Sequence, residues 1–296
     1  MYNYFMNQPL LDTIDLEILM HKDAHFGGSF EVMLDYYSED GLGVQEEFDI
    51  ERIQELAAFD KEGYLSEEIL PELAKNDVIF SKDLYTKLKG CYEQDDELLK
   101  RLSDLILTES YDPIEEIEAL SNFHHRAVKP LLEILVQDHF YSPLNPGYGK
   151  APINAALTLK KIGDTEAIPY LFNALGKSFT ADEVLIDTLI SFGPAGEEFL
   201  QNRLKGAPYT KDNYLAAMAL SSFAVNDETA KLALSLLEEP STLLRSSYTS
   251  YLICICEGLE NEEDRKKFAQ LANTVGLKKN LADEMKIILS FWKKST

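Results

Sequence analysis

Two histidines offer the clearest potential for chemistry in this sequence. His21 and His25 are four residues apart, with Asp23 between them. On a helix this spacing places both imidazoles on one face, a geometry suited to zinc or another divalent metal. A third ligand would come from Asp23 or, through folding, from one of three other histidines: His124, His125 and His139. The alternative is that the pair lies at a helix end before Gly27 and Gly28, where the helix dipole favours histidine.

Residue types that perform covalent catalysis are present, but not in a catalytic pattern. Gly28-Ser29 lacks the second glycine and the flanking strand of a nucleophile elbow. Cys254 and Cys256 lie in no setting that would lower a thiol pKa, and the odd total of three cysteines predicts reduced thiols. The sequence therefore predicts no catalytic residue, no cofactor and no enzyme activity.

A repeated pattern between residues 151 and 239 indicates the fold of the chain. Three segments share a plan of two short helical patterns around a tight turn. The apolar residue that closes the first helix falls at Ile162, Phe192 and Phe223, which are 30 and 31 residues apart. That period is typical of stacked helical hairpins. The sequence predicts an all-α fold, an α-α superhelix in which helical hairpins stack into a solenoid.

Three segments are predicted along the chain. Residues 111–275 contain the repeats, with one further unit on each side of the clearest ones. Residues 1–110 form an acidic, irregular helical region, in which Ser66 and Ser81 occupy positions expected for helix N-caps. Residues 276–296 form a capping helix, because its apolar residues follow one stripe at the helical period: Leu281, Met285, Ile288, Leu289 and Trp292.

One repeat carries the features of a known family. Its residues are Ala155-Ala156, Leu159, Ile162-Gly163-Asp164, Ala167-Ile168-Pro169, Leu171 and Leu175. This pattern resembles a HEAT repeat, especially the bacterial HEAT-like type first noted in phycobilisome lyases, and the similarity extends over residues 113–238. The resemblance implies an armadillo-like solenoid whose second helices line a concave face. It implies no single function, because members of the family include scaffolds, adaptors and occasional enzymes.

Three specialised members of that family can be compared with these residues. HEAT-type diiron hydroxylases need repeated His-Glu pairs, and this chain contains no His-Glu dipeptide. HEAT-type DNA glycosylases need a basic groove, which a chain of formal net charge −23 is poorly suited to form. A bilin lyase remains an open alternative.

Two surfaces are predicted to contact a partner. The first is the concave face, with outward polar side chains on the second helices: Lys129, Glu133, Asn173, Gln201 and Lys231. The second is the connection from residue 138 to residue 150, an insertion of roughly nine residues relative to the neighbouring repeats. Its Phe140, Tyr141 and Tyr148 suit a contact loop. The alternative is that Phe140 and Tyr141 pack over a helix end.

The charge of the chain limits its partners. Residues 1–110 contain 26 acidic and 9 basic residues. Phosphate backbones and anionic membranes attract lysine and arginine, so we expect no nucleic acid partner and a protein or peptide partner that is basic. The alternative is that the charge serves solubility alone. No apolar run reaches the roughly 18 to 20 residues that span a bilayer, so we expect no membrane insertion and a cytoplasmic location, unless a secretion signal without a hydrophobic core is present.

The sequence thus predicts a non-catalytic protein-binding scaffold or adaptor. The competing hypothesis is a metal-binding protein or metal-dependent enzyme centred on His21 and His25. A third possibility is self-association, in which the basic C-terminal helix of one copy meets the acidic N-terminal region of another.

Overall fold

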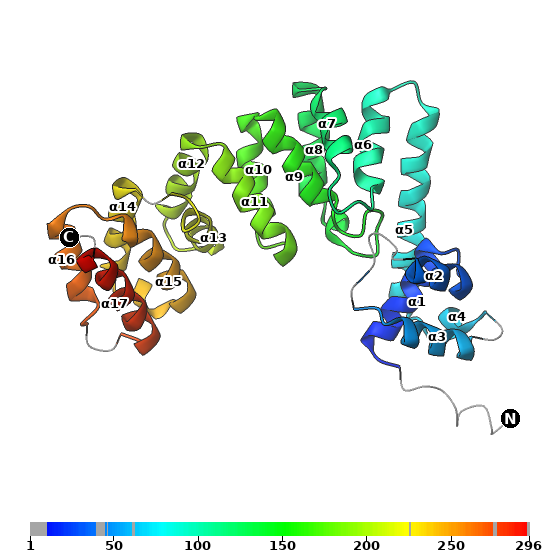
Figure 1. Ribbon diagram of the computed structural model, residues 1–296, viewed down its shortest axis with the longest axis horizontal. Coiled ribbons are helices and arrows are strands. Elements are labelled where there is room, and N and C mark those ends of the chain that lie inside the picture. Colours follow the sequence, from blue (N-terminus) through cyan, green and yellow to red (C-terminus); the bar gives the residue numbers. More distant parts are fainter. Residues whose placement is uncertain are drawn as a thin grey trace. The chain divides into compact units, whose positions relative to one another are not determined.

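The architecture is all-α, as the sequence predicts. The computed structural model describes residues 11–39, 45, 47–60, 63–224, 226–274 and 277–294. Every regular element within these ranges is a helix, and the helices pack against their neighbours in the manner of a helical repeat fold (Figure 1). The chain divides into two compact units, residues 1–164 and 165–296. In the described part of the chain, no helix combines the length and the apolarity needed to cross a membrane.

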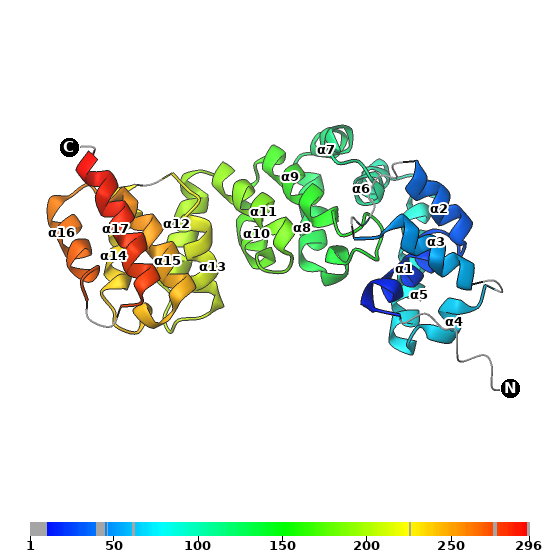
Figure 2. The ribbon, with the colours of Figure 1, turned by 60° about the horizontal axis from the view of Figure 1, so that its bottom comes forward.

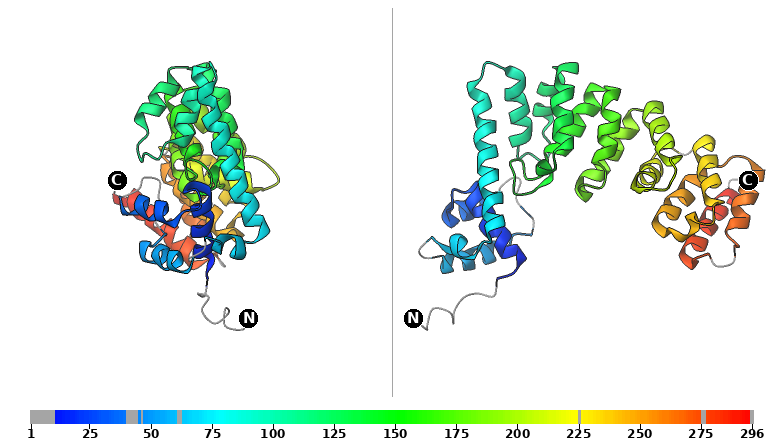
Figure 3. Two further views of the ribbon diagram at one scale, coloured as in Figure 1. Left: turned by 90° about the vertical axis from the view of Figure 1, so that its right-hand side faces the viewer. Right: turned by 180° about the vertical axis from the view of Figure 1, so that it is seen from behind.

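The first unit contains the irregular N-terminal helices and the first repeats. Its helices are α1 (Thr13–His25), α2 (Phe30–Ser38), α3 (Ile50–Phe59), α4 (Leu65–Ile69), α5 (Glu72–Gly90), η2 (Cys91–Glu93), α6 (Glu97–Leu107), α7 (Ile114–Ser121), α8 (His125–Val136), η3 (Asp138–Tyr141) and α9 (Ala151–Ile162). The long helix α5 connects the two parts of the unit. Helices α1 to α4 gather at its N-terminal half, and α6 follows its C-terminal half (Figures 1 and 3).

The N-terminal helices begin at residues that satisfy their first backbone N–H groups. The Asp12 carboxylate accepts the backbone N–H of Asp15, and the Asp15 carboxylate accepts that of Asp12, a reciprocal capping box. Ser29 caps α2 and Asp96 caps α6. Neither Ser66 nor Ser81 is an N-cap, contrary to the sequence prediction: Ser66 lies inside α4, and α5 continues through Ser81 without a break.

The core around α1 to α4 encloses a charged side chain. Apolar residues such as Ile18, Leu19, Met33 and Ile53 are fully buried there. Lys22 is only 1% exposed, and its Nζ lies 3.1 Å from a carboxylate oxygen of Asp60, itself 3% exposed. A second carboxylate, that of Asp23, lies 3.3 Å away, and the Nζ also lies 4.9 Å from the centre of the Phe30 ring. The ammonium group is therefore buried with its compensating charges.

The second unit consists of regular hairpins. Its helices are η4 (Thr165–Ala167), α10 (Ile168–Ala174), α11 (Phe179–Ser191), α12 (Pro194–Leu204), α13 (Lys211–Leu220), α14 (Asp227–Leu237), η5 (Thr242–Leu244), α15 (Ser246–Ile255), η6 (Cys256–Gly258), α16 (Glu262–Leu271) and α17 (Lys279–Lys294). Helices α13, α15 and α17 lie side by side (Figures 1 and 2). Small buried residues, among them Ala216, Ala217 and Ala233, allow close approach of neighbouring helices.

The last helix covers the end of this unit. In α17, Leu281, Met285, Ile288 and Trp292 are buried, as the apolar stripe predicts. The Trp292 ring packs 5.4 Å from that of Phe268, and its indole N–H donates to the backbone carbonyl of Glu257 at 3.1 Å. The opposite face of α17 remains exposed.

Candidate functional site

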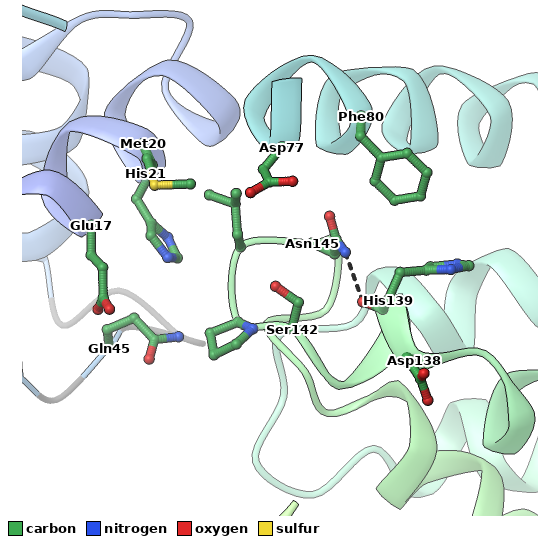
Figure 4. A pocket seen from close by; sticks show the side chains of 12 residues that line it. Glu17, Met20, His21, Gln45, Asp77, Phe80, Asp138, His139, Ser142 and Asn145 are labelled. Carbon is green, nitrogen blue, oxygen red and sulfur yellow. Dashed lines mark hydrogen bonds between the residues drawn. The ribbon is translucent and has the colours of Figure 1, made fainter. Parts of the chain in front are cut away.

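A pocket of about 570 Å³ opens in the first unit between α1, α5 and the loop of residues 138–150, which we call the insertion loop (Figure 4). Its lining residues come from four separate stretches of sequence: α1, Gln45, α5 and the insertion loop. They are Glu17, Met20, His21, Gln45, Asp77, Phe80, Asp138, His139, Ser142, Pro143, Leu144 and Asn145. The pocket therefore exists only when the insertion loop is docked on the N-terminal helices.

The insertion loop is a compact, internally bonded structure. The Asn145 amide donates to the His139 carbonyl at 2.7 Å (Figure 4), and the Tyr141 hydroxyl donates to the Leu135 carbonyl at 2.9 Å. Gly147 has φ +80°, and a Cβ at this position would lie 2.1 Å from the backbone oxygen of Ile106. Only glycine fits so close an approach at positive φ.

Three contacts fasten the loop to α1 and α5. Ser81, buried in the middle of α5, donates its hydroxyl to the Leu144 carbonyl at 2.8 Å. The Leu144 side chain packs in a small core with Ala24 and Val78. Tyr148 has φ +52°, which is unusual for a residue with a bulky side chain, and its ring stacks on that of His25. The strain at Tyr148 is thus coupled to aromatic packing.

The two histidines of α1 belong to an aromatic cluster at the base of the pocket. Their rings stack on each other with 5.0 Å between centroids, so the predicted shared face is present. His25 lies 4.8 Å from Tyr148 on one side, and its Nδ1 is 2.8 Å from the Tyr85 hydroxyl. His21 packs edge-on against Phe48 at 5.0 Å. Both imidazoles therefore pack as aromatic rings.

Burial keeps the cluster uncharged apart from one carboxylate. Burial lowers the pKa of His21 to about 3, and the neighbouring His25 lowers it further. Burial also lowers the pKa of His25 to about 4, although a hydrogen bond with the backbone of Leu144 acts in the opposite direction. Burial also raises the pKa of Tyr36, Tyr85 and Tyr148, an effect reinforced by the charge of Glu109. The Tyr36 hydroxyl donates to that Glu109 carboxylate at 2.6 Å. At neutral pH the imidazoles are neutral and the phenols protonated.

The alternative of a metal site at His21 and His25 finds little support in this geometry. Among the described residues, His21 and His25 belong to no group of three His, Cys, Asp or Glu side chains whose ligand atoms lie within 4.8 Å of one another. The Asp23 carboxylate is paired with Lys22. His139 packs against the Phe80 ring at 5.3 Å, and His125 lies on the surface at 3.4 Å from Asp164. The stacked rings favour a packing role.

The predicted contact residues of the loop are mostly not exposed. Phe140 is only 7% exposed, and Tyr141 and Tyr148 are half-buried. The packing alternative for Phe140 and Tyr141 describes this structure better, since the Tyr141 hydroxyl bonds back to the end of α8. The loop contributes to the pocket through other residues, Ser142, Pro143 and Leu144 among them.

The side chains predicted for the concave face lie on second helices and point outward to different degrees. Lys129, Glu133, Asn173 and Lys231 are exposed. Gln201 is half-buried, and its amide donates to the Thr229 hydroxyl at 2.7 Å. Lys231 pairs with Asp227 at 2.5 Å along α14. Their role in binding stays a prediction.

The chemical character of the pocket comes from residues that sequence reasoning did not select. The pocket is lined by three carboxylates, those of Glu17, Asp77 and Asp138, and by apolar side chains that include Met20 and Phe80. Phe80 is 43% exposed, one of three large apolar side chains of α5 that face solvent, with Leu73 and Ile79. Such a pocket suits a ligand with an aliphatic stem and a positive charge.

Comparison of the chain with protein-family models, with curated proteins and with solved structures finds no match.

Proposed function

We propose that this protein is a non-catalytic protein-binding scaffold, and that its first unit receives a lysine or arginine side chain of a basic partner in the pocket between α1, α5 and the insertion loop. The single observation that carries the proposal is the combination of carboxylates and exposed apolar surface in one preformed cavity. The HEAT-like pattern of residues 113–238 supports it, because stacked hairpins offer rigid surface to partners.

Each part of the pocket has a role in this proposal. The aliphatic stem of the guest side chain packs on Met20, and its charged head lies over the face of Phe80 or beside a carboxylate. Among the described residues of this unit, Glu17 and Asp77 take part in no ion pair, unlike Asp60 and Asp15, which pair with Lys22 and Arg52. The pocket therefore keeps acidic groups available for a guest.

The test uses fluorescent oligolysine and oligoarginine peptides as probes, with oligoglutamate for comparison. The pocket variant is Glu17→Gln/Asp77→Asn, and the control Glu93→Gln/Asp95→Asn removes the same two charges from exposed sites outside the pocket. Exposed ion pairs contribute about 0.2–1 kcal/mol each, so we expect roughly twofold to thirtyfold weaker binding by the pocket variant alone. Equal weakening by both variants would reduce the interaction to net charge and refute the proposal.

The metal hypothesis has its own direct test. Elemental analysis of the purified protein, with thermal unfolding measured in the presence and absence of chelator, reports on His21 and His25 together. Stoichiometric zinc and a chelator-sensitive melting temperature would favour that hypothesis over a packing role for the stacked rings.

A further inference from the structure

The second unit contains an apolar groove on its first helices. It has a volume of about 640 Å³ and is lined by Gly176, Phe179, Asp182, Glu183, Ile186, Asp187, Ile190, Lys211, Tyr214, Leu215, Met218, Ser222 and Tyr251. These residues belong chiefly to α11 and α13. Helix α13 packs directly on α15, whereas the groove separates α11 from α13. A groove is thus left open between these two neighbouring helices.

The apolar character of this groove is exposed to solvent. Phe179, at the first turn of α11, is 94% exposed. Ile186, Ile190 and Met218 are half-buried along the groove walls. Burying such side chains against an apolar partner is favourable by about 25 cal/mol per Å² of apolar area. An amphipathic helix would cover them in the helix-in-groove mode.

The rim of the groove specifies the charge of the occupant. Asp182, Glu183 and Asp187 line it, against one lysine, Lys211. The Asp182 carboxylate accepts the backbone N–H of Gly176 at 2.7 Å and is therefore fixed in place. An occupant should carry lysine or arginine beside its apolar anchors, because opposite charge at a rim guides encounter and register.

The exposed face of α17 has this composition. Ile287 and Phe291 are 55% and 50% exposed and lie four residues apart, so they project from the same side of the helix. Lys286, next to Ile287, is exposed and pairs with Asp283 on the same helix at 3.1 Å. Residues 277–294 contain five lysines against Asp283 and Glu284, in a chain whose net charge is −23.

We propose that the groove between α11 and α13 docks the exposed face of α17 from a second copy of this chain. The contact is between copies, because the opposite face of α17 is buried on its own unit through Leu281, Met285 and Ile288. The two surfaces differ, so the contact is heterologous: each copy offers one groove and one ridge, and copies add head to tail. One helix in one groove buries less than the roughly 1,000 Å² of a stable interface, so the association is weak and depends on concentration.

The proposal is tested by sedimentation velocity of the full chain over a range of concentrations. The groove variant is Phe179→Glu and the ridge variant Ile287→Glu. The matched control is Leu244→Glu, which adds the same charge at a residue of the same unit that is 78% exposed and outside the groove. All three positions are exposed, and circular dichroism verifies the fold of each variant. Where helicity is reduced, Phe179→Ser and Ile287→Ser replace the charged variants.

We expect the average mass of the wild-type chain and of Leu244→Glu to rise with concentration. The groove and ridge variants should each remain monomeric. A mixture of the groove variant and the ridge variant should form dimers but no larger species, because each variant keeps only one intact surface. A wild-type chain that stays monomeric at every concentration, or one that binds a basic amphipathic peptide in the groove without self-association, would overturn the assignment of a second copy. Self-association that survives in either single variant would overturn it as well.

Discussion

The imidazole of His25 stacks on the phenol ring of Tyr148, with 4.8 Å between the ring centroids and 30° between their planes. This contact joins the end of α1 to the insertion loop between α8 and α9. It lies next to His21, which lines the pocket, and combines a neutral histidine with a tyrosine at positive φ. The stability of the loop and the protonation of the histidine are therefore linked.

Truncation of Tyr148 should loosen this arrangement. In Tyr148→Ala the backbone strain at positive φ remains and the aromatic packing is lost, so we expect a destabilisation of about 3–5 kcal/mol. Tyr148→Phe keeps the ring and removes only the hydroxyl, and about 1 kcal/mol is expected. Urea unfolding measures both free energies, and equal losses in the two variants would contradict a role for the ring.

Acidification should destabilise the first unit through its two buried histidines. Their pKa values in the folded chain, about 3 and about 4, lie below the ordinary value of 6.5, so the unfolded chain binds more protons. The stability they contribute is complete above about pH 6.5 and is lost as the pH falls through their folded pKa values.

The pH effect is measured by comparing unfolding free energies across that window. His25→Phe keeps a ring and removes the titration, so its stability should fall less steeply with acid than that of the wild-type chain. His125→Gln serves as the control, because the His125 side chain is 82% exposed. An unchanged slope in His25→Phe would show that other groups dominate acid unfolding.

The close approach at Gly147 should not tolerate a side chain. Gly147→Ala brings a Cβ to 2.1 Å from the Ile106 oxygen, and the loop must shift off α6. Positive φ alone costs alanine about 1–2 kcal/mol, and the clash adds to this. Gly63→Ala measures the cost of positive φ without a clash, because Gly63 has φ +77° and open space around it. We expect a melting temperature clearly lower for Gly147→Ala than for Gly63→Ala.

Removal of one partner of the buried Lys22–Asp60 ion pair should destabilise the N-terminal core. Lys22→Met leaves the Asp60 carboxylate buried without its cation, which costs about 3–5 kcal/mol. Lys22→Met/Asp60→Asn removes the uncompensated charge and should recover part of the loss. A double-mutant cycle gives the coupling energy; additive effects would show that Lys22 and Asp60 do not depend on each other.

The regular hairpins could be predicted from sequence because their signal is local. The apolar period around Ile162, Phe192 and Phe223 marks the ends of α9, α11 and α13 to within a few residues. The stripe of α17 is equally clear: Leu281, Met285, Ile288 and Trp292 are buried as expected, and Leu289 is half-buried. Each of these elements is determined mainly by side chains in its own helix and in the adjacent one.

The N-terminal part and the pocket depend on contacts between distant segments, which local patterns do not reveal. Ser81 has the residue type of an N-cap, yet it lies inside α5 and bonds the Leu144 carbonyl. The spacing of His21 and His25 correctly placed both rings together. Their partners, Tyr85 and Tyr148, come from other segments, so the aromatic cluster could not be derived from the spacing.

The docking of the insertion loop on α1 and α5 also has a consequence during synthesis. Ribosomes extend chains at about 5–20 residues per second, so α1 and α5 emerge roughly 3–25 seconds before the loop that covers them. During this interval the face that carries Ala24 and His25 is covered by α5 alone, without Leu144 and Tyr148 of the loop. Nascent molecules of this protein should therefore engage chaperones at this face, and release from them should coincide with the appearance of Leu144 and Tyr148.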